Sequence, residues 1–518
     1  MKNPQISTLY SEKLLDTVID FIKKNRNTII GSLLSGFLAY MFMITNKYPN
    51  HDELVCLFTI GTTFESGRWG LEILSLLFPD MSMPWIHGVL SILFLTLSSC
   101  LVVHIFRIRS RILQMLVGGL IVSFPSQICN FTFMFTSTAY TIAFLMAVGA
   151  VYFFIGKGLL RKAAGVVLLV GSLSMYQAYL AVTVSLLILY FFFELLHERD
   201  TVKSILLRGL TSVVWIVVAL GIYYLISQVF WRITGRTMGP YASGAMALDP
   251  SKILLQIKDA YISFVETLVF QKNGIALTRI SRVAYPILLL TTLGGVLVAG
   301  IRSKKWSFLA LELVLLALLP FGIGCLFLIF QKDSIHTMVL YSYCSLFVLF
   351  AGMVEFFLQE GDWKQVIQKL IVLGRDGIVL LLALLLAGNI FIANKAYLGM
   401  HLFYEHTYFF TSAILNRMQD TPGYTTDSKV AIIGEYTEPD YYSVYFTDLA
   451  QMNGVRALNP NAYSIREFFE MYNGIPLNQA TPEEVEAIAN TQEFQEMATY
   501  PNEGYMKTIG DVIVIKLS

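Results

Sequence analysis

The chain has 518 residues, of which 55% are hydrophobic and 14% are charged, and its formal net charge is +1. A mean hydropathy of +0.62 exceeds what a soluble globular protein needs to fill its core, so the composition excludes that class and indicates a polytopic membrane protein. The five cysteines have neither the spacing of a disulfide framework nor that of a zinc site: Cys56, Cys100, Cys129, Cys325 and Cys344.

Eleven apolar runs are close to the roughly 17 to 25 residues that a helix needs to cross about 30 Å of hydrocarbon. They lie near 28–45, 85–106, 112–126, 138–156, 163–178, 180–196, 209–230, 284–301, 306–330, 338–357 and 373–393. The third and fifth runs are the shortest. The sequence therefore predicts a polytopic α-helical membrane protein with about 11 transmembrane helices.

Basic residues between these runs predict the orientation, because short cytoplasmic loops carry an excess of Lys and Arg. The predicted inside loops carry Arg107, Arg109 and Arg111; Lys157, Arg161 and Lys162; Arg199, Lys203 and Arg208; Arg302, Lys304 and Lys305; and Lys364 and Lys369. With the N-terminus inside, an odd number of spans places the C-terminus outside. The outer segments are then 46–84, 127–137, 231–283, 331–337 and the C-terminal tail.

The first outer segment holds a group of charges at the membrane boundary, in the stretch NHDELVCLFTIGTTFESGRWGLEIL at 50–74. Asp52 and Glu53 are placed where one carboxylate would accept a proton from a hydroxyl nucleophile, as a general base. Acidic residues also commonly cap a helix or mark the water boundary after a span. The apolar pattern of 69–78 suits a helix that lies in the interface above a cavity, which favours the catalytic interpretation.

Arg68, in the stretch SGRWG, is a suitable phosphate ligand because its guanidinium matches phosphate oxygens in a bidentate fork. Gly67 and Gly70 would also let a ligand approach the backbone closely. The alternative is that Arg68 only anchors the segment at the interface beside Trp69. Carboxylates and arginines this close to hydrocarbon are usually retained for a substrate or an ion, so Glu65 and Trp69 are substrate-binding candidates as well.

The long outer segment 231–283 carries an excess of basic residues, although the positive-inside rule gives no reason for such an excess on the outer side. Arg232, Arg279 and Arg282 are therefore candidates to bind an anionic partner such as a lipid phosphate. Long loops are only weakly constrained by the rule, so these residues also fit a loop without such a role.

Three further candidates lie at predicted outer ends. Tyr176 and Gln177 follow the fifth run and would offer hydrogen bonds to a sugar, although ordinary interfacial tyrosines have the same pattern. His336 lies in the outer turn at 331–337, where a lone histidine is more often simply solvated.

Residues 394–518 differ in kind, with no apolar run of membrane length and with 16 acidic against 7 basic residues. KVAIIGEY and DVIVIKLS have the pattern of buried strands, whereas TPEEVEAIANTQEFQEM has that of a helix with its N-terminus near Thr481. The sequence predicts two domains: a multi-span domain at 1–393 and a small extracytoplasmic α/β domain at 394–518.

These features together resemble the Gtr type II group of bacterial glucosyltransferases. The resemblance is carried by Asp52 with Glu53, SGRWG at 66–70, SLSMYQAYL at 172–180, RISRVAYPILL at 279–289 and ANKAY at 393–397. That group is similar to the C superfamily of integral-membrane glycosyltransferases (GT-C). The resemblance implies transfer of a hexose, glucose above all, from a polyprenyl-phosphate carrier such as undecaprenyl-phosphate glucose to a cell-surface glycan, on the outer face of the bacterial cytoplasmic membrane.

Carried over by position, Asp52 would be the catalytic base with Glu53 as the neighbouring acid, and Arg68 would meet the donor phosphate. The acids here are Asp then Glu rather than two aspartates, which leaves open which carboxylate is the base and whether a metal joins them. We expect no obligatory metal and no other cofactor. The expected partners are the lipid-linked donor, the glycan acceptor and the bilayer, but no nucleic acid.

A transporter or flippase of a lipid-linked sugar is the competing class. Transporters tend to place charges and broken helices near the bilayer midplane, often in two similar halves, whereas here the acids lie on one face and no repeat is found. A polysaccharide polymerase or ligase, which would use a diphosphate-linked donor, is a third interpretation that the loop at 231–283 does not exclude.

Overall fold

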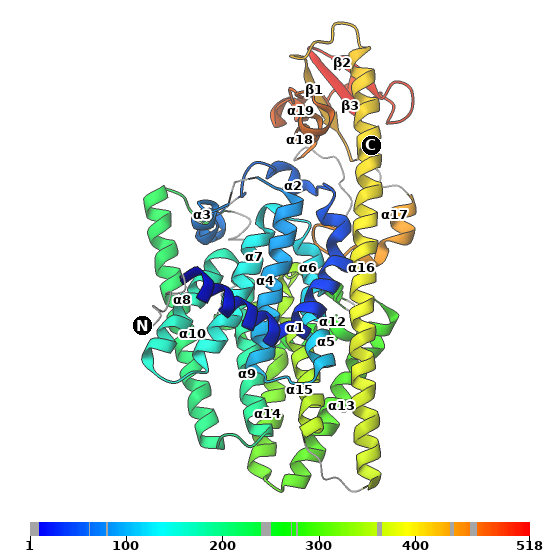
Figure 1. Ribbon diagram of the computed structural model, residues 1–518. Coiled ribbons are helices and arrows are strands. Elements are labelled where there is room, and N and C mark those ends of the chain that lie inside the picture. Colours follow the sequence, from blue (N-terminus) through cyan, green and yellow to red (C-terminus); the bar gives the residue numbers. More distant parts are fainter. Residues whose placement is uncertain are drawn as a thin grey trace, which may run out of the picture.

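Helices dominate the computed structural model, which describes residues 10–61, 63–78, 81–239, 250–270, 272–275, 278–359, 365–435, 440–455 and 464–518 (Figure 1). Within these ranges nine helices are long and apolar enough to cross a membrane. They form a bundle, and a three-stranded sheet with short helices stands at one end of it beside α16 (Figure 1). The chain is thus a multi-pass membrane protein.

Two predicted spans are not among these nine, which include the continuous helical segments Gln177–Leu196 and Tyr341–Gln359. The third run forms α5, which has 12 residues, and the fifth forms α8, which has 17. The helices before the C-terminal region are α1 (Tyr10–Ile44), α2 (His51–Val55), α3 (Trp69–Ser75), α4 (Pro84–Ile105), α5 (Arg111–Val122), α6 (Pro125–Asn130), α7 (Met134–Phe154), α8 (Leu159–Met175), α9 (Leu180–Leu196), α10 (Val202–Thr234), α12 (Ile253–Val269), α13 (Arg279–Ser303), α14 (Trp306–Ile323), α15 (Ser345–Gln359) and α16 (Gln365–Gln419).

The short helix α5 ends inside the bundle, where the carbonyl groups of its last turn need hydrogen-bond donors other than water. The buried hydroxyl of Tyr40 donates to the Val122 carbonyl oxygen over 2.8 Å. The buried hydroxyl of Tyr341 donates to the Ile121 carbonyl oxygen over 2.6 Å. Tyrosines from α1 and from the segment before α15 therefore satisfy the end of a helix that is too short to span the bilayer alone.

The segment 231–283, predicted as one long loop, contains the helix α12, which packs against α13 and α14. Ala260, Phe264 and Leu268 recur every four residues and are buried on one face of this helix. The helix also contains Lys258, Asp259 and Glu266, which interrupt its apolar run, so hydropathy did not predict it.

The helix α16 continues without a break through the domain boundary predicted at residue 394 and ends only at Gln419. Beyond that position Ala396, Met400 and Phe403 are buried at helical spacing. The change in composition near residue 394 therefore does not mark the end of the helix.

The C-terminal region contains β1 (Lys429–Ile433), α17 (Asp440–Tyr445), α18 (Ile465–Phe468), α19 (Pro482–Ala489), α20 (Gln492–Gln495), β2 (Met506–Ile509) and β3 (Val512–Lys516). The strand order is β1-β3-β2, with β1 parallel and β2 antiparallel to β3. The two segments predicted as strands form β1 and β3. Thr481 caps α19 in a capping box with Glu484.

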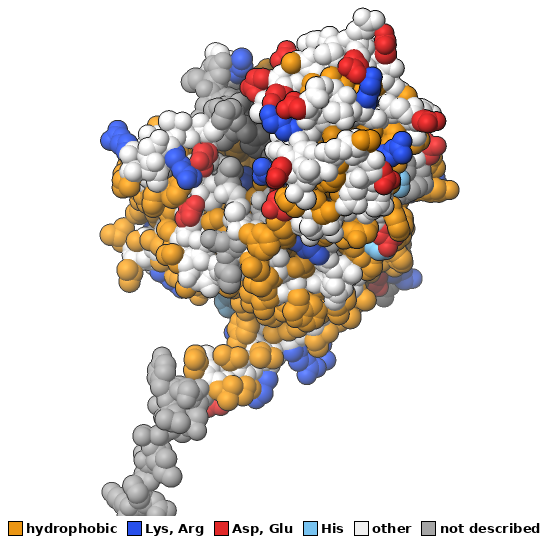
Figure 2. Space-filling view, turned by 90° about the horizontal axis from the view of Figure 1, so that it is seen from above, with side chains coloured by type: hydrophobic (Ala, Val, Ile, Leu, Met, Phe, Trp, Pro, Cys, Tyr) orange, Lys and Arg blue, Asp and Glu red, His pale blue; other side chains and the backbone are white. Residues whose placement is uncertain are grey.

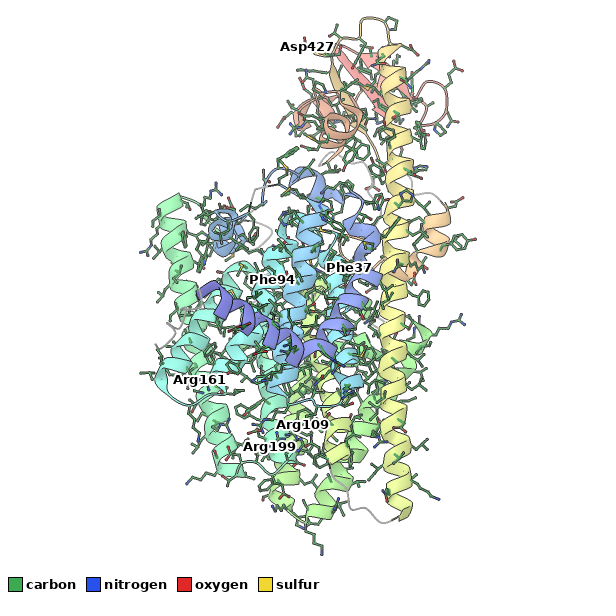
Figure 3. All side chains as sticks on the ribbon, viewed as in Figure 1. Phe37, Phe94, Arg109, Arg161, Arg199 and Asp427 are labelled. Carbon is green, nitrogen blue, oxygen red and sulfur yellow. The ribbon has the colours of Figure 1, made fainter. Side chains whose placement is uncertain are left out.

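Charge is distributed unevenly along the bundle. Arg109, Arg161 and Arg199 lie on the half that is distant from the C-terminal region, which Asp427 marks (Figure 3). Acidic side chains are spread over the C-terminal region, whereas hydrophobic side chains cover the flank of the bundle (Figure 2). Lys364, which was assigned to a basic loop, lies outside the described residues.

Candidate functional site

The helix α2 is fixed between the bundle and the C-terminal region. Asn50 caps it by accepting a hydrogen bond from the Glu53 backbone N–H over 2.8 Å. The Asn50 amide donates to the Thr132 carbonyl oxygen, between α6 and α7, over 3.0 Å, and lies 3.5 Å from the Gly454 carbonyl oxygen. The segment that contains Gly454 follows α17 and therefore touches both α2 and the bundle.

The two acidic residues of α2 have different surroundings. The Asp52 side chain is exposed, and it has no hydrogen bond or ion pair with any residue that the structure describes. Glu53 is only 1% exposed and is bonded to Lys47 and Ser82. Burial raises the pKa of Glu53, while Lys47 opposes that rise. Consecutive residues of a helix point about 100° apart, so a pair that is adjacent in sequence is divided between solvent and interior.

The following residues form a turn that leads into α3. Gly67 adopts a left-handed conformation with φ +67°, which a glycine adopts without steric cost. The Gln177 amide donates to the Ser66 carbonyl oxygen over 2.8 Å, and the Tyr223 hydroxyl donates to the Gly67 carbonyl oxygen over 3.0 Å. Residues of α10 and of the segment after α8 thus hold the turn in place.

The helix α3 packs against α8 and α10. The Trp69 indole N–H donates to the Ser227 hydroxyl over 3.2 Å, and the ring stacks on Phe230 with centroids 5.3 Å apart. A Cβ atom at Gly70 would collide with Ser174, so this glycine allows a close approach of α8. Trp69 and Gly70, which were predicted to lie at a ligand, both take part in helix packing, and neither lines the cavity described below.

Arg68 lies against an aromatic pair from two helices of the bundle. Its Nη1 donates to the Tyr140 hydroxyl over 2.8 Å. The guanidinium carbon lies 5.8 Å from the centroid of Tyr140 and 5.4 Å from that of Tyr176, and these two rings stack with centroids 4.2 Å apart. Cation–π contact fixes the direction of the guanidinium without neutralising its charge.

A cavity of about 210 Å³ opens beside this guanidinium. Its lining includes four residues predicted from the sequence, which are Arg68, Tyr176, Gln177 and His336. The remaining walls are mostly aromatic or aliphatic and include Tyr223, Tyr224, Trp231, Met238, Phe330, Ile335 and Val339. The cavity therefore combines one cation with largely apolar walls.

His336 faces the same cavity from the segment between α14 and α15. Its Nδ1 atom is buried and has no hydrogen-bond partner among the described residues. Burial, together with the nearby charge of Arg68, lowers the pKa of His336 to about 4. The imidazole ring of His336 is therefore neutral at pH 7. Of these two residues, only Arg68 presents a positive charge to the cavity.

The other predicted residues lie elsewhere. Arg232, Arg279 and Arg282 are exposed on α10 and α13 and do not line the cavity. Glu65 pairs with Arg236, with 3.1 Å between the charged atoms. Asp52 and Glu53 do not line the cavity either.

Three residues of the site were not predicted from the sequence: Tyr140, Tyr223 and Trp231. The Trp231 indole N–H donates to the Phe64 carbonyl oxygen over 2.7 Å, so it braces the turn before Arg68. Tyr223, Ser227 and Trp231 recur every four residues along α10, and this polar and aromatic stripe was the available signal.

No group of three or more His, Cys, Asp or Glu side chains suited to a metal occurs in the described part of the chain. All five cysteines are free and buried.

Comparison with known proteins identifies the family of this chain. A segment of 79 residues is 34% identical to part of the UPF0761 membrane protein YihY of Salmonella paratyphi B, and the match covers 15% of this chain and 26% of that protein. Residues 41–349 match the family described as Glucosyl transferase GtrII, and this range includes α2, α3 and every residue that lines the cavity. Because the match extends over more than half of its residues, the chain belongs to the GtrII glucosyltransferase family.

Proposed function

We propose that this protein transfers a glucosyl group from a polyprenyl-phosphate carrier to a cell-surface glycan on the outer face of the bacterial cytoplasmic membrane, in the manner of GT-C enzymes. The observation that carries the proposal is the position of Arg68, a cation held in a largely apolar cavity. The basic loops at the opposite end of the bundle support an inside N-terminus, and with that orientation the cavity and the C-terminal region would lie outside.

The cavity suits a lipid phosphate because its two kinds of lining match the two parts of such a donor. The Arg68 guanidinium would bind the phosphate oxygens, and aromatic walls such as Trp231 and Phe330 would contact the first isoprenoid units. Neutral His336 would add a hydrogen bond through its unpartnered Nδ1. In surroundings of low polarity a fixed cation stabilises the charge that develops on a leaving phosphate more strongly than in water.

Asp52 is the residue that we assign as general base. Its carboxylate would take the proton of the acceptor hydroxyl while the acceptor oxygen forms its bond to the anomeric carbon. The bond from that carbon to the phosphate oxygen breaks, and its electron pair leaves with the lipid phosphate. The exposed Asp52 carboxylate is available for this step, whereas Glu53 is held by Lys47 and Ser82. The mechanism uses no obligatory metal.

The C-terminal domain is placed to organise both parts of the site. The Thr337 hydroxyl, next to His336, donates to the Gln451 carbonyl oxygen over 2.8 Å. Gly454, three residues further on, lies against Asn50 beside Asp52. We therefore assign to this domain the role of covering the site and receiving the acceptor glycan.

The test is transfer from radiolabelled undecaprenyl-phosphate glucose by purified protein in nanodiscs, with a cell-envelope fraction as acceptor. Wild-type protein should transfer label, and the Asp52→Asn variant should not. Asp427→Asn, which removes an exposed carboxylate at the far tip of the C-terminal region, is the matched control and should remain active. If the wild type transferred no label but moved the lipid across proteoliposome membranes, the protein would be a flippase and the proposal wrong.

A further inference from the structure

A second cavity lies at the end of the bundle that is distant from the C-terminal domain. It measures about 440 Å³, is open to the surroundings, and is lined by α1, α4, α5, α7 and α9 together with the turn between α4 and α5. Lys24, Arg107 and Arg109 line it, with Tyr152 and Tyr190 as aromatic walls. Figure 3 shows Arg109 at this end of the bundle. This cavity contains none of the residues assigned to glucosyl transfer.

Positive charge in this cavity is only partly neutralised. Arg107 lies 3.7 Å from Glu194, and Arg199 shares the same carboxylate at 3.5 Å. Within the described ranges no carboxylate lies within 4.0 Å of the charged atoms of Lys24 or Arg109. The cavity therefore presents at least two cations that lack an ion-pair partner in the described structure.

Two further cations lie against the aromatic walls. The guanidinium of Arg161 lies 5.3 Å from the ring centroid of Tyr152. That of Arg208 lies 5.6 Å from the centroid of Tyr190 and is paired with Asp200 at 2.7 Å. The positive-inside rule accounts for basic residues at this end of the bundle, but it does not require them to converge on a cavity between helices.

We propose that this cavity binds the phosphate of an anionic phospholipid from the inner leaflet. Lys24, Arg107 and Arg109 would bind the phosphate oxygens, and the tyrosine walls would contact the glycerol backbone. Basic pockets between transmembrane helices on the cytoplasmic side are a recurrent way of binding such head groups. A lipid bound here joins α1 to α4, α7 and α9, and it stabilises the bundle from the side opposite to the transfer site.

Retention of phosphatidylglycerol by purified protein, measured by native mass spectrometry, tests the proposal. Wild-type protein should retain phosphatidylglycerol in preference to phosphatidylcholine. The Arg107→Gln/Arg109→Gln variant should bind it about thirtyfold more weakly, because each cation near an anionic lipid contributes about a fivefold factor. The control Lys203→Gln/Lys304→Gln removes two exposed cations at the same end of the bundle but outside the cavity and should bind as the wild type does.

Equal retention by both double variants would overturn the proposal. Displacement of the lipid by millimolar inorganic phosphate would also overturn it, because the cavity would then be a site for free phosphate. Lys24→Gln, which changes an exposed residue of α1, gives a second test should the arginine variant fold poorly, with a loss of about fivefold expected. Glucosyl transfer, assayed on the same samples, separates failure of this proposal from failure of the proposed function.

Discussion

The two halves of the first outer segment pack against different parts of the molecule. The helix α2, with Asp52 and Glu53, lies between the bundle and the C-terminal region, whereas η1 (Phe64–Ser66) and α3 lie against α8 and α10. Charges that are neighbours in the sequence are thus distributed to two places. A cluster of charges that is continuous in the sequence therefore need not form one charged site, and in the proposed mechanism the base and the phosphate ligand are held by different parts of the fold.

The Asp52→Asn variant is the strongest test of the different roles proposed for the two halves of the first outer segment. We expect transfer to fall about a thousandfold, equivalent to about 4 kcal/mol in the barrier, because the amide cannot accept the acceptor proton. Thermal unfolding should be unchanged, since the Asp52 side chain is exposed. If this variant transferred glucose at the wild-type rate, Asp52 would not be the general base, and Glu65 would be the next residue to test.

The Glu53→Ala substitution should lower the free energy of unfolding. Removing this buried carboxylate leaves the Lys47 ammonium without its partner, at a cost of about 3 kcal/mol in unfolding free energy. The matched variant Lys47→Met/Glu53→Gln removes both charges and should recover much of the loss. Thermal unfolding in detergent measures both effects. If Glu53→Ala abolished transfer but left the unfolding temperature unchanged, Glu53 would take part in the reaction. That result would contradict the proposal that Asp52 is the base and that Glu53 is structural.

Arg68→Gln examines the other half of the segment. The amide keeps a hydrogen-bond donor but loses the charge, so we expect kcat/KM for the lipid-linked donor to fall about a hundredfold, or about 3 kcal/mol. Arg232→Gln removes an exposed cation from the same outer end and should have little effect. Equal losses in the two variants would contradict the assignment of the donor phosphate to the cavity.

The neutral state of His336 predicts a dependence of stability on pH. Its pKa is about 4 in the folded protein, below the usual value near 6.5, so the unfolded chain binds the proton more readily. The contribution of neutral His336 to the free energy of unfolding is therefore fully present above about pH 6.5. It is lost as the pH falls towards 4, and at pH 5 the loss is about 2 kcal/mol. Unfolding curves of wild type and His336→Asn should differ in this window. Parallel curves would mean that the ring is solvated.

The sequence predicted the parts of the fold that depend on long apolar runs. It did not distinguish α5 from a full span, because the support for α5 comes from distant residues such as Tyr40 and Tyr341. It also missed α12, whose apolar face is interrupted by charges. The composition of a segment cannot predict a helix that depends on contacts with other helices.

For the site, the outer ends of the predicted spans supplied Arg68, Tyr176, Gln177 and His336, which the structure brings to one cavity. Their convergence follows from the topology, because spans that end on the same face bring their ends together. Tyr223 and other residues of α10 were missed because polar and aromatic residues near the end of a span have the pattern of an interfacial belt. Only packing shows that they face Arg68 and not lipid.

The turn at Gly67 permits a finer comparison, since Gly235 at the end of α10 has nearly the same left-handed backbone, with φ +66° against +67°. Alanine costs about 1 kcal/mol in that conformation at either position. At Gly67 a Cβ atom would also lie 2.7 Å from the Tyr223 hydroxyl, whereas at Gly235 it would meet nothing within 4 Å. Gly67→Ala should therefore displace the Tyr223 hydroxyl from the turn and raise the KM for donor about fivefold, while Gly235→Ala should leave it unchanged. Equal KM values would show that the bonds from Tyr223 and Gln177 to this turn do not position Arg68.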